Sequence, residues 1–221
     1  MTWFTKEFIT FFKELEKNND REWFAVNKPL YEKAVKIPFE QFVTDLIAAL
    51  SKEDKRLAVD PKKAIFRIYK DTRFSKDKTP YKVHASAAIS AGGRKSTSEI
   101  GVYIELGAKH LGIAGGLYSP EKEQIEDVRA EIALDPKGWK KALNEKSFKS
   151  MWGGVQGERN KILPPDYKAL MTEVPEIANK QFYYWVELPV SMITSEDLVK
   201  TIVKHYKASA SVRSFLWKAL N

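Results

Sequence analysis

The chain has 221 residues, of which 43% are hydrophobic and 12% aromatic, and this composition is enough to bury a sizeable core. It carries 37 Lys and Arg against 29 Asp and Glu, and the resulting net charge of +8 favours an anionic partner. It has no cysteine, which excludes disulfides, thiolate metal sites and cysteine nucleophiles, and we expect a cytoplasmic protein.

The first part of the chain predicts a layer of helices. Charged residues at positions 6, 7, 13 and 14 interrupt the amino-terminal apolar residues, so we expect neither a signal peptide nor a membrane span there. Apolar residues recur at helical spacing from Phe4 to Leu15 and again from Phe39 to Leu50. Residues 1–55 are therefore predicted to form a helical layer.

Beyond Pro61 the apolar period changes from 3.6 to 2, which indicates strands. Alternation predicts strands over 66–69, 83–89 and 100–106, with Phe66 and Ile68 facing the core. Gly107 and Ala108 suit a two-residue type II′ turn, which would place Leu106 opposite Lys109 and start a fourth strand. The pairs that follow from this register are Glu105 with His110, Ile104 with Leu111, Tyr103 with Gly112 and Val102 with Ile113.

Helices are predicted again after Pro120, and the run at 182–188 reads as one more strand that could be covered on both faces. Helices through 198–203 and 212–216 close the chain. The expected fold class is α+β, with an antiparallel sheet of about five strands packed against N-terminal and C-terminal helices. We expect one domain over 1–221, with the helical layer at 1–55, a sheet-forming core at about 62–118, and helices with a further strand at 120–221.

Positive charge is concentrated in residues 62–82, where eight basic residues accompany two acids, Asp71 and Asp77, for a net charge of +6. Such a concentration predicts an anion site, because arginine and lysine side chains bind phosphate and carboxylate. If alternation holds, Arg67, Asp71 and Arg73 share one face of the sheet with small residues that leave room for a ligand. The residues expected to bind the ligand are Arg67, Asp71, Arg73, Lys76, Lys78, Lys82 and His84.

Glu105 and His110 would lie opposite each other on that face, next to Tyr103, and are the candidates for acid–base catalysis. The same two residues could instead be an ordinary cross-strand pair, and Arg67 with Asp71 could be a structural ion pair. With three histidines and no cysteine, we expect no metal site, and no motif indicates a cofactor.

Two other functions are compatible with the basic segment. Tyr69, Phe74 and Tyr81 could stack on the bases of a single-stranded nucleic acid, with the lysines on its backbone. Alternatively, the charges could form an ion-pair network that only stabilises a long loop. We expect no membrane partner, and the sequence indicates neither the oligomeric state nor whether the protein is an enzyme.

The motif from Asp71 to Lys82, DTRFSKDKTPYK, follows Arg67-Ile68 and is accompanied by Trp23-Phe24 and Gly115-Gly116. Together with the GERNKILPPDY stretch at 157–167, it resembles a family of bacterial and fungal proteins that share a domain of unknown function. The resemblance spans roughly Phe4 to Phe215 and implies one domain over the chain. It supplies no activity, substrate, cofactor or catalytic residue.

Overall fold

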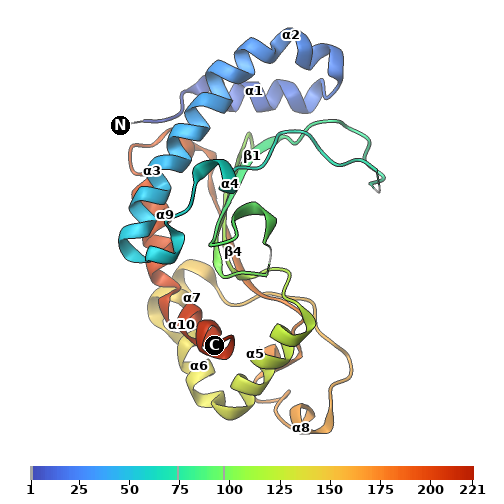
Figure 1. The fold of residues 1–221 in the computed structure, drawn as a ribbon, viewed down its shortest axis with the longest axis vertical. Coiled ribbons are helices and arrows are strands. Elements are labelled where there is room, and N and C mark those ends of the chain that lie inside the picture. The colour runs from blue at the N-terminus through green and yellow to red at the C-terminus, as the bar shows by residue number, and fades with distance from the viewer. Residues whose placement is uncertain (1, 74, 97) are drawn as a thin grey trace.

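The computed structural model describes residues 2–73, 75–96 and 98–221, and these form an α+β fold. A four-stranded antiparallel sheet in the order β1-β2-β3-β4 lies among helices from both the N-terminal and the C-terminal parts of the chain (Figure 1). The strands are β1 (His84–Ile89), β2 (Gly101–Gly107), β3 (His110–Leu117) and β4 (Phe182–Pro189).

The helices come in two groups, one before the sheet and one after its third strand. The first group is α1 (Lys6–Lys17), α2 (Arg21–Tyr31), the π-helix η1 (Glu32–Lys36), α3 (Ile37–Glu53), the 3₁₀ helix η2 (Lys55–Leu57) and α4 (Pro61–Ala64). The second is α5 (Lys122–Leu134), α6 (Pro136–Asn144), α7 (Lys146–Trp152), α8 (Pro165–Lys168), α9 (Leu198–Ala208) and α10 (Ala210–Ala219). Three 3₁₀ helices complete the fold: η3 (Gly93–Lys95), η4 (Pro175–Ala178) and η5 (Val190–Thr194).

Local sequence explains where the first helices begin. The hydroxyl of Thr5 accepts a hydrogen bond from the Glu7 amide, and the Asp20 carboxylate accepts one from the Trp23 amide, so both helices have side-chain N-caps. The helical layer predicted for the N-terminal part is therefore present. In the described ranges, no helix combines the length and the apolar character needed to cross a membrane.

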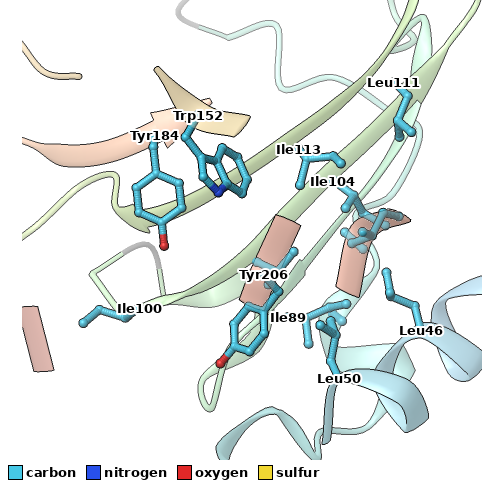
Figure 2. Close-up of a cluster of buried hydrophobic side chains, with 14 of the residues drawn as sticks. Leu46, Leu50, Ile89, Ile100, Ile104, Leu111, Ile113, Trp152, Tyr184 and Tyr206 are labelled. Carbon is cyan, nitrogen blue, oxygen red and sulfur yellow. The ribbon is translucent and has the colours of Figure 1, made fainter. Parts of the chain in front are cut away.

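The sheet packs one face against α3, α7 and α9 and builds the core there (Figure 2). Leu46 and Leu50 of α3 lie beside Ile89 and Ile104 of the sheet in this cluster, and all four are fully buried. The buried cluster extends from Phe4 to Leu216 along the chain. The period-2 pattern is confirmed, because apolar residues of each strand point to this face.

The predicted register of the β2–β3 hairpin is wrong by two residues. Leu106 pairs with Leu111 and Glu105 pairs with Gly112, so Ala108 and Lys109 connect the strands in place of the expected Gly107 and Ala108. A type II′ turn needs a positive φ at its first central residue, and Gly107 does not have one. Because the shift is two residues, every side chain keeps its predicted face, and only the cross-strand partners change.

The sheet has four strands where about five were expected, because the segment at 66–69 is not a strand. The stretch from Ile65 to Tyr69 instead forms two isolated bridges, Ile65 with Ala87 and Tyr69 with Tyr81. Alternation therefore does not hold along it. Ile68 is buried as predicted, whereas Phe66 turns to the other face of the sheet and contacts the Tyr103 ring at 6.2 Å between centroids.

Candidate functional site at the open face of the sheet

The face of the sheet that turns away from the core carries small and polar residues in register. Glu105 lies between Ser86 of β1 and Gly112 of β3, and Tyr103 lies between Ala88 and Ala114. Trp185 of β4 continues the row of Tyr103 and Ala114. Small side chains on neighbouring strands leave space above this face, and the larger side chains stand around it.

Glu105 is the centre of the polar groups on this face. Its Oε2 accepts a hydrogen bond from the Tyr103 hydroxyl at 2.9 Å, and its Oε1 lies 2.9 Å from Nε2 of His110. Nε2 of His84 lies 3.7 Å from Oε2 on the β1 side. The Glu105 side chain is only 17% exposed, so these contacts hold the carboxylate in one place.

Burial shifts the pKa values of two neighbours of this carboxylate. It raises the pKa of Tyr103, and the nearby charge of Glu105 raises it further, so the phenol stays protonated and can donate. Burial also lowers the pKa of His84, against the opposing effect of Glu105, so its imidazole is neutral at pH 7. The site thus combines a held carboxylate, a phenol donor and two imidazoles, which are groups suited to proton transfer.

A cavity of about 530 Å³ lies beside this cluster, within the size range of small-molecule sites. Glu105 and Tyr103 line it, and Glu99 and Gln156 add further polar groups. Its floor includes the small residues Ala88, Gly101, Ala114 and Gly116. Its aromatic lining consists of Phe66, Tyr103, Tyr118, Tyr183 and Trp185.

Glycine at position 112 is what allows Trp185 to take its place in this wall. A Cβ on Gly112 would lie 2.0 Å from Cη2 of the indole, which is far inside van der Waals contact. The ring centroids of Trp185 and Tyr103 are 6.4 Å apart, so the two form one aromatic surface. Any side chain at position 112 would displace that surface.

Sequence reasoning missed most of the aromatic lining of the cavity. The signal was the alternation within β4, where Phe182 and Tyr184 are buried while Tyr183 and Trp185 are partly exposed. That pattern marks one covered face and one open face, not a strand covered on both. The large aromatic and long polar residues of the lining that were not predicted for the site are Phe66, Glu99, Tyr118, Gln156, Tyr183 and Trp185.

A second hollow, the basic groove, lies between the helical layer and the segment from α4 to Asp71. Its volume is about 1230 Å³, and Arg67 and Lys82 line it together with Asp71. Phe66 lines both the basic groove and the sheet-face cavity. The other charged residues along it are Lys28, Lys36, Lys62, Arg94 and Lys95, with Glu32, Glu40 and Asp60. Positive residues outnumber negative ones in this groove.

The remaining predicted ligand-binding residues lie on an arm, which we define as residues 70–73 and 75–80, and which extends away from the sheet (Figure 1). Arg73 donates two hydrogen bonds to the Asp71 carboxylate, at 3.0 and 2.7 Å, and this contact is the main cause that lowers the Asp71 pKa to about 2. Lys76 is exposed nearby. The guanidinium of Arg73 is thus engaged within the arm itself.

Two lysines of the arm are also bonded within it. The Lys70 amine donates to the Asp77 carboxylate and to the Thr79 hydroxyl, both at 2.7 Å. The Lys78 amine donates to the Thr72 carbonyl at 2.9 Å. These local contacts fold the arm back on itself.

Of the three aromatic residues expected to stack on bases, Tyr81 is unavailable. Its ring is buried and stacked on Phe24 at 4.0 Å, and the Asn19 side chain bonds both its amide and its carbonyl. Tyr69 is 49% exposed, whereas Phe74 lies outside the described residues. Of these three rings, the described residues therefore offer one that is exposed, that of Tyr69 next to the arm.

The structure thus divides the predicted site residues among three places. His84, Tyr103, Glu105 and His110 are together on the sheet face, Arg67, Asp71 and Lys82 line the basic groove, and Arg73, Lys76 and Lys78 belong to the arm. Among the described residues, no group of three or more His, Asp or Glu is arranged to hold a metal ion.

Comparison with known proteins gives a family without an assigned activity. Residues 7–215 match the profile of a family described as conserved hypothetical protein (DUF2461). No similar protein was found in a search of curated proteins. The match covers nearly the whole chain, as the resemblance of the Asp71–Lys82 motif implied. The chain therefore belongs to the DUF2461 family of conserved hypothetical proteins.

Proposed function

We propose that this protein binds a small molecule with a planar, apolar body in the sheet-face cavity, and that Glu105 and His110 exchange a proton with it. The observation that carries the proposal is the Glu105 carboxylate, fixed by Tyr103 and His110 at the edge of an aromatic-lined cavity. Aromatic walls with a few convergent polar groups are typical of small-molecule sites. Flat rings of a ligand stack well on flat side chains.

Blocking the cavity floor tests this proposal. Ala114→Leu adds volume above the floor without touching the polar groups, so it should abolish binding of planar probes. Adenosine and riboflavin are suitable uncharged probes of two sizes, and isothermal titration calorimetry measures their binding directly. Ala169→Leu, at an exposed position after α8, is the matched control and should bind as the wild type does.

The results separate clearly. Saturable binding of either probe by the wild type and the control, with loss in Ala114→Leu, supports the proposal. Failure of both probes to bind the wild type, or equal binding by Ala114→Leu, contradicts it. A proton-transfer role for Glu105 and His110 further predicts that Glu105→Gln binds the probe with an altered pH dependence.

A second candidate role, a purely structural one, is favoured for the arm alone. The contacts of Arg73 with Asp71 and of Lys70 with Asp77 pair four of its charges locally. Such exposed pairs contribute little individually but restrict a loop together. Limited digestion with trypsin at rising salt concentration tests this role, since the arm should be cleaved faster as the pairs are screened.

Three further hypotheses concern an alternative function, the location of the protein and its number of domains. Nucleic-acid binding along the arm is the alternative function, and binding that weakens steeply with salt would support it. The cysteine-free sequence is in keeping with a cytoplasmic location. One domain is supported by the buried cluster that includes residues from both ends of the chain.

A further inference from the structure

Phe66 separates two hollows of opposite character and lines both of them. On one side is the aromatic sheet-face cavity with Glu99 and Glu105, and on the other is the basic groove. The Lys82 amine lies over the Phe66 ring, 4.7 Å from its centroid. A ligand of the cavity that extends past Phe66 would therefore reach a cationic position.

Arg67 and Lys82 differ from Lys70 and Arg73 in their partners. Arg73 and Lys70 form ion pairs within the arm, whereas neither Arg67 nor Lys82 forms one in the part of the chain that the structure describes. Asp71 also lines the groove, but the Arg73 fork already bonds both its carboxylate oxygens. Within the described residues, two cations thus lie along one groove without a carboxylate in ion-pair contact.

Arg67 is close enough to Lys82 to disfavour the charge of its amine. Burial is the main cause that lowers the pKa of Lys82, the positive charge of Arg67 lowers it further, and Glu105 opposes both effects. A dianion placed between the two would convert this repulsion into two attractive contacts. Guanidinium and ammonium groups together are well suited to a phosphate monoester.

We propose that the molecule bound in the sheet-face cavity carries a phosphate monoester, which Arg67 and Lys82 bind on the far side of Phe66. The planar body would lie against Tyr103 and Trp185, and the phosphate in the basic groove. This inference rests on the proposed function and assigns the ligand to a chemical class, that of phosphorylated planar molecules such as mononucleotides. It uses two of the predicted ligand-binding residues and leaves the cations of the arm out.

The test compares probes that differ only in the phosphate. Adenosine is paired with AMP and riboflavin with FMN, and calorimetry gives the ratio of the two Kd values within each pair. Hydrogen bonds to charged groups predict that the phosphorylated member binds at least about tenfold more tightly. Arg67→Met and Lys82→Met should each reduce this ratio toward one by weakening the binding of the phosphorylated member.

Lys200→Met is the matched control, because it makes the same change in net charge on α9, where the side chain is 85% exposed. It should keep the full ratio. Equal affinity within each pair, or an equal loss of the ratio in Lys200→Met, would overturn the inference and leave the sheet-face cavity as a binding site. Failure of both members of both pairs to bind would overturn the proposed function as well.

Discussion

Asp54 connects the end of α3 to the C-terminal helices, and its loss should destabilise the protein in a pH-dependent way. Its carboxylate accepts two hydrogen bonds from the Arg56 side chain, at 2.9 and 2.7 Å, and one from the Tyr206 hydroxyl at 2.7 Å. Arg213 lies 3.8 Å away. The Asp54 side chain is 11% exposed, so water screens these contacts only weakly.

The hydrogen bonds from Arg56 are the largest cause that lowers the Asp54 pKa from 3.8 to about 2. At 1.36 kcal/mol per pKa unit, this shift corresponds to about 2 kcal/mol of folding free energy at pH 7. A lowered carboxyl pKa stabilises the fold above the unfolded-state value and loses that contribution as the pH falls toward the folded-state value. About half of it should remain at pH 3.

Asp54→Asn keeps the shape and removes the charge, so it should lower the free energy of unfolding by about 2 kcal/mol at pH 7 and by about 1 kcal/mol at pH 3. Urea unfolding at a series of pH values measures both. Asp71→Asn is the control, because its pair with Arg73 is exposed and lies only two residues apart, and it should have a smaller effect that salt removes. Parallel stability curves for wild type and Asp54→Asn would refute the reasoning.

Two other substitutions probe the base of the arm and the cavity wall. Asn19→Ala removes both side-chain hydrogen bonds to the buried Tyr81, at 2.9 and 3.0 Å. It should lower the free energy of unfolding in urea by about 2 kcal/mol and speed the tryptic cleavage of the arm. An unchanged rate of cleavage would contradict this prediction. Gly112→Ala should displace Trp185 and lower the free energy of unfolding by about 1–2 kcal/mol. It should also weaken riboflavin binding at least tenfold in calorimetry. An unchanged Kd would contradict the role of Trp185 in the cavity wall.

The sequence was sufficient to predict the fold class and the face of each strand, because apolar period and burial are directly related. It was insufficient for the β2–β3 register, because Gly107 fits both the first position of a tight turn and the last position of β2, where the structure has it. A two-residue shift conserves the apolar face, so the pattern alone cannot detect it. Glu105 and His110 still contact each other, as diagonal neighbours in place of directly opposed ones.

The site was harder to predict than the fold, because it depends on where one short segment bends. Residues 66–69 alternate like a strand, but two isolated bridges replace a continuous ladder. Phe66 therefore faces Tyr103, and Arg67 lines the basic groove away from the histidines. Composition identified the charged segment, but which cations pair locally depends on the fold of the arm, which periodicity does not encode.

The fourth strand follows the third only after the whole run from α5 to η4, yet it supplies Trp185 and Tyr183 to the cavity. During synthesis, β1 to β3 leave the ribosome well before their last neighbour. A chain cut before Phe182 would keep Tyr103 and Glu105 but expose β3 as an unprotected edge, which invites pairing with other nascent molecules. Formation of β4 thus completes the sheet-face cavity and covers the edge of β3 in the same late step of synthesis.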